Sequence, residues 1–297
     1  MSHNSIFSKK FCLNNGLEMP AVGLGTYRIK KPDLIMEAVD HALAAGYRMF
    51  DTAAVYYNEE YLKNAFNVLL PKYGLQRKDI FITTKLAPAD LNRPQEACLQ
   101  SLDKLGIDCV DLYLIHFPGN LKVGLSGEEK VKIRDKAWRG LVQLYKAGKT
   151  KAIGVSNYTV THLKELMQNN YGVIPTVNQV EWHPYYYQPE LLQYCKENNI
   201  LLQAYSSLGT SSNTDSESSI LYDLTVNDIA KKLKISNAQL LLKWALQQNV
   251  SVIPKSTNPV HIQENIQLDF TISAEDMKAL NALGKKNIKY AWNPNDI

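Results

Sequence analysis

The feature that most constrains the fold is an alternation that runs through nearly the whole chain. Short apolar or β-branched runs are each followed by a longer segment of helical periodicity, a pattern typical of β-α-β units around a parallel sheet. The short runs are almost continuously apolar, which suits strands covered on both faces. The predicted strands lie at 21–26, 47–52, 80–85, 110–116, 151–156, 176–182, 200–206 and 250–255.

The segments between these strands carry signals for the start and the end of helices. Pro32 precedes a periodic apolar stripe that Gly46 ends, and Pro94 and Gly106 frame a second segment in the same way. Proline suits the first helical turn, where its missing N–H has no intrahelical partner. Helices are predicted at 33–46, 93–106, 129–148, 161–170, 189–199, 237–249 and 259–268.

Two further segments fall outside the repeating units. Residues 11–20 read as a β-hairpin with Asn15-Gly16 at the turn, and this hairpin is placed to cover one end of a barrel. Residues 273–284 read as a final helix whose N-cap is Ser273. The sequence therefore predicts short additions at both ends of the repeating pattern.

Eight consecutive β/α units without a linker favour an α/β protein with a single (β/α)8 TIM barrel, formed by residues 1–297 as one domain. Closing eight parallel strands into a ring leaves no free edge. The alternative is an open doubly wound sheet, which would need a G-x-G-x-x-G turn after its first strand. The nearest match, residues 22–25 (VGLG), lacks that spacing and precedes no helix, so a Gly-rich strand end is favoured.

Composition excludes several classes of function. With 45% hydrophobic residues and a net charge of +4, the chain is neither a disordered nor a fibrous protein. It has no basic cluster for nucleic acid and no apolar run of about 20 residues for a membrane span. The N-terminus lacks a signal-peptide core, so an intracellular, cytoplasmic protein is expected. The cysteines are scattered without a C-x-x-C motif, which disfavours disulfides and zinc.

Polar residues end three consecutive predicted strands. These residues are Asp51, Lys85 and His116, and Tyr56 follows shortly after Asp51. Each of them alone is more simply explained as a buried ion pair, a hydrogen-bonded core residue or packing. Because neighbouring strands lie about 4.8 Å apart, the set should converge at one point on the catalytic face of a barrel. Four converging titratable groups are typical of an active site.

The residue types indicate proton transfer to a polarised carbonyl. The chain has no G-x-S-x-G elbow and no H-E-x-x-H motif, and His183 is a weak candidate metal ligand, so no metal is expected. A lysine near a tyrosine is expected to lower the phenol pKa from about 10, with Asp51 orienting Lys85. His116 could then donate a hydrogen bond to the substrate oxygen. Such a site needs a hydride donor, which must be a cofactor.

Several long motifs in the right order resemble the aldo-keto reductases, a family of NAD(P)H-dependent carbonyl reductases on a β/α barrel. The resemblance spans about residues 12–284 and rests on YRMFDTAAVYYNEE, KL, DLYLIHFP, GVSNY, NQVEWHPY, AYSSLG and IPKS. It implies that Tyr56 donates the proton, that Lys85 and Asp51 tune it, and that His116 orients the carbonyl.

The same resemblance implies a cofactor site. Ser156, Asn157 and Gln179 would bind the nicotinamide carboxamide beside Asp51, and Tyr205 would stack on its ring. The remaining implied contacts, along the diphosphate, the adenosine phosphate and the adenine, are Ser206, Leu208, Lys255, Ser256, Thr257, His261, Glu264 and Asn265. His261 stands where the family commonly has arginine, which weakens phosphate binding. NADPH is therefore expected, with NADH left open.

The implied substrate is a small carbonyl compound. Its pocket would be lined by Tyr27, Ala87, His116, Phe117 and Trp292. A small residue at Ala87 and a short C-terminal tail suggest an open pocket, as in the diketogluconate-reductase-like and prostaglandin-F-synthase-like branches. A monomer is expected. The alternatives are a non-catalytic NADP(H)-binding barrel with a structural or regulatory role, and a metal-assisted hydrolase.

Overall fold

The computed structural model describes residues 9–119, 125–209 and 219–291, so the predicted contact Trp292 lies outside the described residues. At the centre is a sheet of eight parallel strands that follow one another in chain order. They are β3 (Leu24–Gly25), β4 (Met49–Asp51), β5 (Phe81–Leu86), β6 (Val110–Ile115), β7 (Thr150–Ser156), β8 (Val177–Glu181), β9 (Leu201–Tyr205) and β10 (Ser251–Val252).

Hydrogen bonds between the first and last strands close the sheet into a barrel. The amide of Gly23 donates to the carbonyl of Val252 at 2.9 Å, and the amide of Gly25 donates to that of Pro254 at 3.0 Å. A Cβ atom on Gly25 would lie only 2.6 Å from the carbonyl oxygen of Ile253. Glycine is therefore required here by the close approach of two strands, and residues 22–25 are the Gly-rich strand end that the sequence favoured.

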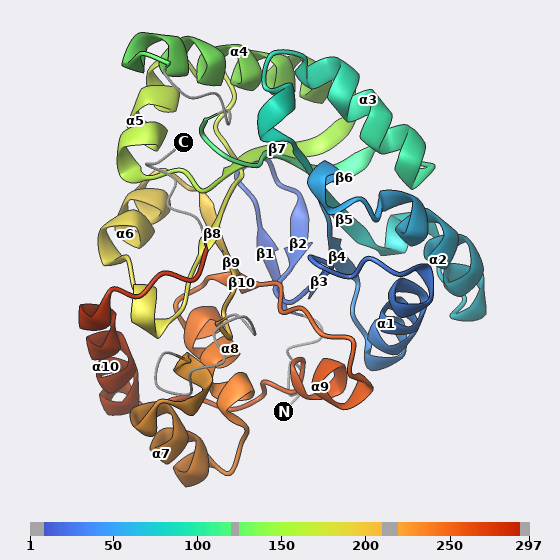
Figure 1. Cartoon of the computed structure of the whole chain (residues 1–297). Coiled ribbons are helices and arrows are strands. Elements are labelled where there is room, and N and C mark those ends of the chain that lie inside the picture. Colours follow the sequence, from blue (N-terminus) through green and yellow to red (C-terminus); the bar gives the residue numbers. More distant parts are fainter. Residues whose placement is uncertain (1–8, 120–124, 210–218, 292–297) are drawn as a thin grey trace.

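The helices surround the strands, as Figure 1 shows. They are α1 (Pro32–Ala45), α2 (Glu59–Lys72), α3 (Pro94–Leu105), α4 (Gly127–Lys146), α5 (Val160–Gln168), α6 (Pro189–Glu197), α7 (Leu224–Leu233), α8 (Asn237–Gln247) and α9 (Pro259–Glu264). Neither α2 nor α7 is among the helices predicted from the sequence. The helix α2 has no side-chain cap at its start and carries Pro71 in its last turn. The helix α7 has Asp223 as its N-cap and comes shortly after a long polar stretch.

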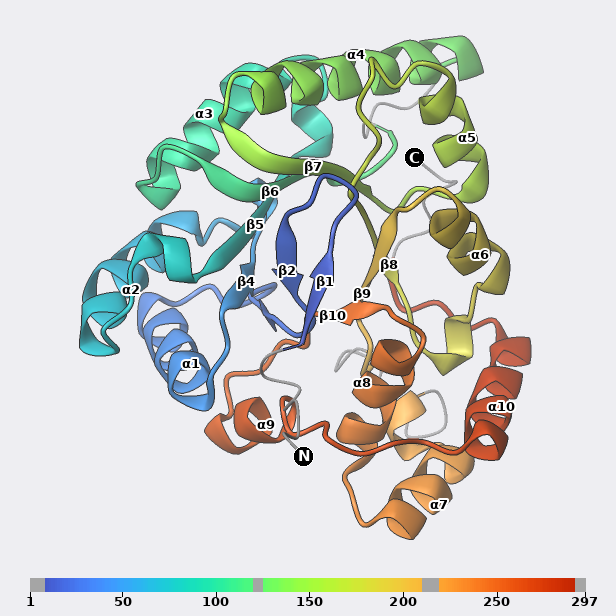
Figure 2. The same cartoon turned by 180° about the vertical axis from the view of Figure 1, so that it is seen from behind.

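The amino-terminal hairpin covers one end of the barrel (Figure 2). Its strands β1 (Lys10–Cys12) and β2 (Glu18–Pro20) pair antiparallel. The side-chain amide of Asn14 donates to backbone carbonyls just before β8 and β9, and that of Asn15 donates to a carbonyl within β7, at 2.9 to 3.1 Å. The hairpin thus closes the end at which the strands begin, and the opposite end stays available for a site.

The extra C-terminal helix is also present, as α10 (Ala274–Ala282). Its N-cap is Ser273, whose hydroxyl accepts from the amide of Asp276 at 3.1 Å. The predicted (β/α)8 barrel with a hairpin and a final helix is therefore confirmed. Within the described ranges, no helix combines the length and apolarity that crossing a bilayer requires.

Candidate active site

Three neighbouring strands and one short turn bring the predicted catalytic residues together. Asp51 is the last residue of β4, Lys85 lies near the end of β5, and His116 directly follows β6. Tyr56 ends a single 3-10 turn, Ala54–Tyr56, that follows β4. All four therefore lie at the carboxyl ends of the strands, where (β/α)8 enzymes carry their active sites.

A buried ion pair forms the base of the site. The Lys85 Nζ lies 2.7 Å from Asp51 Oδ1, and the two side chains are 0% and 3% exposed. The same ammonium donates to the carbonyl oxygen of Thr52 at 2.7 Å and to the Tyr56 hydroxyl at 3.4 Å. These three contacts use the three donors of the ammonium. Lys85 is thus held in one position beneath the phenol.

The protonation of the phenol differs from the sequence-based expectation. Burial raises the pKa of Tyr56 well above 10, and the nearby Asp51 carboxylate raises it further. The expected lowering of the Tyr56 pKa is therefore wrong in direction, because burial and the Asp51 carboxylate raise it. Lys85 Nζ lies 2.7 Å from Asp51 and 3.4 Å from the phenol oxygen. Tyr56 therefore keeps its proton at neutral pH, which is the state that a proton donor requires.

His116 is a neutral imidazole in this environment. Burial lowers its pKa well below 6.5, and the charge of Lys85 lowers it further. Its ring stands edge-on to the ring of Tyr56, with the ring centres 5.7 Å apart. Among the described residues its Nδ1 has no hydrogen-bond partner. A neutral imidazole carries one N–H that can donate to a carbonyl oxygen without competing for the role of acid.

A network of amides continues the site across the barrel. Gln179 Nε2 donates to Asp51 Oδ2 at 2.7 Å, and Asn157 Nδ2 donates to the carbonyl oxygen of His116 at 2.9 Å. The hydroxyl of Tyr205 in turn donates to Asn157 Oδ1 at 2.7 Å. Asn157 has a left-handed φ of 64°, which asparagine tolerates better than most residues. Asn157 Nδ2 also donates to the Ser156 hydroxyl at 3.1 Å, and this hydroxyl donates to the carbonyl oxygen of Gln179. The network therefore joins the ion pair to β7, β8 and β9.

The other predicted cofactor residues lie along the same half of the strand-end face. Ser156 ends β7 and donates its hydroxyl proton to the carbonyl oxygen of Gln179 at 2.8 Å. Ser206 and Leu208 follow β9, Lys255, Ser256 and Thr257 follow β10, and His261, Glu264 and Asn265 lie in or directly after α9. Lys255 and His261 are exposed, whereas Ser256 and Asn265 are buried.

The predicted substrate residues lie around the phenol. The ring of Tyr27 is 53% exposed, and its centre lies 5.0 Å from that of Tyr56. Phe117 stacks on His116 with ring centres 5.2 Å apart. Ala87 is only 6% exposed, so it contributes little surface to the mouth. Two aromatic rings therefore flank Tyr56 and His116.

Sequence reasoning missed one buried charged residue at the same end of the barrel. Glu181 is the last residue of β8, is 1% exposed, and accepts a hydrogen bond from His183 Nε2 at 3.0 Å. The signal was available, because Asn178, Gln179 and Glu181 interrupt an apolar strand. His183 is bound to this carboxylate, and the described ranges contain no group of three metal-binding side chains.

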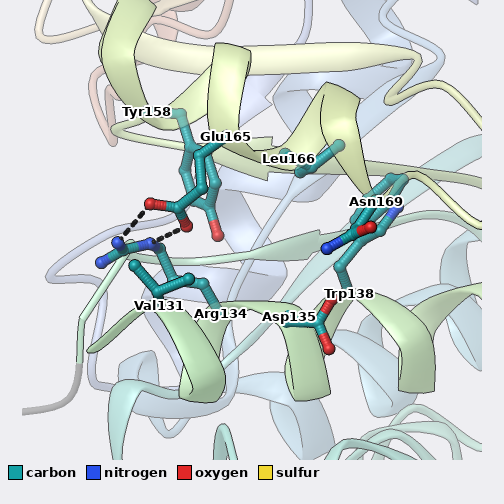
Figure 3. A pocket seen from close by; sticks show the side chains of 8 residues that line it. All are labelled: Val131, Arg134, Asp135, Trp138, Tyr158, Glu165, Leu166 and Asn169. Atoms are coloured by element: carbon teal, nitrogen blue, oxygen red, sulfur yellow. Dashed lines mark hydrogen bonds and ion pairs between the residues drawn. The ribbon is translucent and has the colours of Figure 1, made fainter. Parts of the chain in front are cut away.

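A hollow lies between α4 and α5 (Figure 3). It is lined by Val131, Arg134, Asp135, Trp138, Tyr158, Glu165, Leu166 and Asn169. The Arg134 guanidinium faces the Glu165 carboxylate and makes two hydrogen bonds to it, of 2.6 and 2.7 Å. Because these two charges neutralise each other, the hollow is explained by packing between the two helices.

The barrel, the buried ion pair beneath a phenol and the adjoining amide network define the class of protein: a β/α-barrel oxidoreductase that acts on carbonyl groups. The model of the aldo/keto reductase family matches residues 21–285, and the chain belongs to that family. Glyoxal reductase of Bacillus subtilis is 40% identical, with 96% of each chain covered. Glycerol 2-dehydrogenase (NADP(+)) of Saccharomyces cerevisiae is 37% identical, with 97% of this chain and 95% of the relative covered.

Solved structures agree with the sequence relatives. The crystal structure of an aldo/keto reductase from Brucella melitensis is 37% identical and has a TM-score of 0.79. The alignment covers 93% of this chain and 99% of that one. The recognition made from the motifs is thereby confirmed, and the chain is an enzyme of a family that uses nicotinamide cofactors.

Proposed function

We propose that this protein is an NADPH-dependent reductase of aldehydes and ketones in which Tyr56 donates the proton. The observation that carries the proposal is the position of Lys85, which touches both the Asp51 carboxylate and the Tyr56 hydroxyl. A structural ion pair alone would not need a phenol as a third partner. We also propose that residues 1–297 act as one domain.

The described residues fit a nicotinamide. The side-chain amides of Asn157 and Gln179 are the groups that pair with a carboxamide, and both lie within one network with Asp51. The half-buried ring of Tyr205 offers an aromatic face beside them. When bound, the reduced cofactor supplies the hydride that the carbonyl carbon receives.

The remaining chemistry belongs to side chains of this chain. The His116 N–H would orient the carbonyl oxygen, and the O–H of Tyr56 would pass its proton to that oxygen as charge develops there. An alkoxide is a much stronger base than a phenolate, so the transfer is favourable even with a raised phenol pKa. The phenolate that remains would be stabilised by the Lys85 ammonium at 3.4 Å. Exchange with solvent would restore the phenol.

The preference for NADPH rests on Lys255. Its exposed ammonium follows β10 and could pair with a 2′-phosphate. His261 is smaller than the arginine common in the family and lacks its forked guanidinium, so some use of NADH is expected. The yeast relative is named as an NADP(+) enzyme, which supports the proposal.

The test is the carbonyl-dependent loss of NADPH and NADH absorbance with a panel of aldehydes, ketones and quinones. Reduction with a lower KM for NADPH than for NADH is expected, and Lys255→Met should narrow that difference. Tight binding of cofactor without turnover on any substrate would contradict the proposal and favour a non-catalytic barrel.

A further inference from the structure

Lys286 to Ala291 form a segment that we call the C-terminal strap, and this strap converges on Glu181. Three of its groups donate to the Glu181 carboxylate, namely Lys289 Nζ and the backbone amides of Tyr290 and Ala291. Together with His183, the carboxylate thus accepts from four donors while only 1% exposed. A buried carboxylate is costly unless fully paired, so its partners are held firmly in place.

A second group of hydrogen bonds holds the start of the C-terminal strap. Lys286 Nζ donates to Asp223 Oδ2 at 2.8 Å and to the hydroxyl of Tyr185 at 2.9 Å. The amide of Ile288 donates to the carbonyl oxygen of Tyr185 at 3.0 Å. The strap therefore follows one path, from the N-cap of α7 to the carboxyl end of β8.

Tyr290 connects the C-terminal strap to residues that follow β9. Its hydroxyl accepts from the amide of Ile220 at 3.0 Å. Its ring lies against Gly209, where an added Cβ would come within 3.3 Å of a ring carbon. The side chain of Tyr290 thus contacts both Gly209 and Ile220. Gly209 directly follows Leu208, one of the proposed diphosphate contacts.

Glu181 also lies close to the proposed nicotinamide position. It is paired in register with Tyr205 on β9, and Gln179 two residues earlier binds Asp51. We infer that Glu181 and Tyr290 are positioning residues for the cofactor. Glu181 fixes the strap, and Tyr290 fixes the residues after β9 against which the diphosphate would lie. This inference rests on the proposed function, and it assigns the strap to cofactor retention and not to carbonyl recognition.

The test compares Tyr290→Phe with a matched control, Tyr171→Phe. The first variant removes the hydroxyl, which accepts from the amide of Ile220, and keeps the ring. The control removes a hydroxyl that donates to Asp135 at 2.8 Å on the outer helices. NADPH affinity and release rate are measured by fluorescence titration and stopped flow, alongside KM for the carbonyl substrate and the melting temperature.

Tyr290→Phe is expected to raise the NADPH dissociation constant and release rate about 3- to 10-fold, the range for one lost hydrogen bond. The KM for the carbonyl substrate should change by no more than about twofold. A larger change would require the loss of a hydrogen bond to the carbonyl substrate itself. Glu181→Gln should shift the same quantities further, and Tyr171→Phe should leave them unchanged.

An unchanged NADPH affinity in Tyr290→Phe, or a rise confined to the carbonyl KM, would overturn the inference. The proposed function is judged separately, on the wild-type protein. If wild-type protein binds and oxidises NADPH, that proposal stands whatever the variants show.

Discussion

Replacing Lys85 by methionine separates the structural role of the buried ion pair from its chemical role. Methionine keeps the length and the apolar stem but removes the charge that faces Asp51 at 2.7 Å. Removing one partner of a buried pair typically costs about 3–5 kcal/mol of unfolding free energy, because the other charge stays buried and unpaired. Asp51 keeps its hydrogen bond from Gln179, which places the expected loss near the lower end, about 3 kcal/mol.

The double variant Asp51→Asn/Lys85→Met makes the separation measurable. With neither charge present, the unfolding free energy should recover to within about 1–2 kcal/mol of wild type, since neutral replacements of buried pairs are often tolerated. Activity should not recover. Loss of the ammonium beneath Tyr56 removes the stabilisation of the developing phenolate, so kcat should stay about 10²- to 10⁴-fold below wild type in both variants.

The assay pairs urea unfolding followed by circular dichroism with steady-state NADPH oxidation at saturating cofactor. If kcat recovers together with stability in the double variant, Lys85 acts only on the fold and the reasoning is refuted. If Lys85→Met lowers the unfolding free energy by less than about 1 kcal/mol, the claim that the Asp51–Lys85 pair is shielded from water is refuted.

Three further predictions follow from particular residues. The ring resonances of His116 should show no titration midpoint near pH 6.5 in NMR spectra, because burial lowers its pKa well below that value; a midpoint near 6.5 would contradict this. Burial raises the pKa of Glu181, but His183 and Lys289 outweigh this and lower it to about 2, so its stabilisation is complete above about pH 5 and is lost as pH falls toward 2. Glu181→Gln should therefore unfold in urea with about 3 kcal/mol less free energy at pH 7, and a gap that does not narrow in acid would oppose this reading. Gly25→Ala should cost about 1–3 kcal/mol, because its Cβ would meet the carbonyl oxygen of Ile253, while Gly127→Ala, with open space around its Cβ, should cost almost nothing in the same unfolding assay.

The barrel could be predicted because each level of the sequence agrees on it. Apolar runs predict the strands, while first-turn prolines such as Pro94 and closing glycines such as Gly106 mark the ends of helices. These local signals alternate along the chain in the same order as the eight strands. The helix α2 was missed although Leu62, Ala65, Phe66 and Leu69 form an apolar stripe that is buried. A proline at its end, and not at its start, obscured the pattern.

The strand-end residues could be predicted for the same reason, since position along a strand fixes the end of the barrel that a residue reaches. The pKa direction of Tyr56 could not. It depends first on how deeply the phenol is buried and then on its closeness to the Asp51 carboxylate, and no sequence pattern encodes either. The contact between the C-terminal strap and Glu181 could not be predicted either, because the two lie more than 100 residues apart in the sequence.

The most direct measurement is single-turnover reduction of an aldehyde by Tyr56→Phe. The variant keeps the ring that packs against Tyr27 and His116 and removes the hydroxyl that carries the proton to be donated. We expect NADPH to bind with wild-type affinity and the rate of its oxidation to fall by about 10²-fold or more. A rate within a few-fold of wild type, with the cofactor bound normally, would show that Tyr56 is not the proton donor.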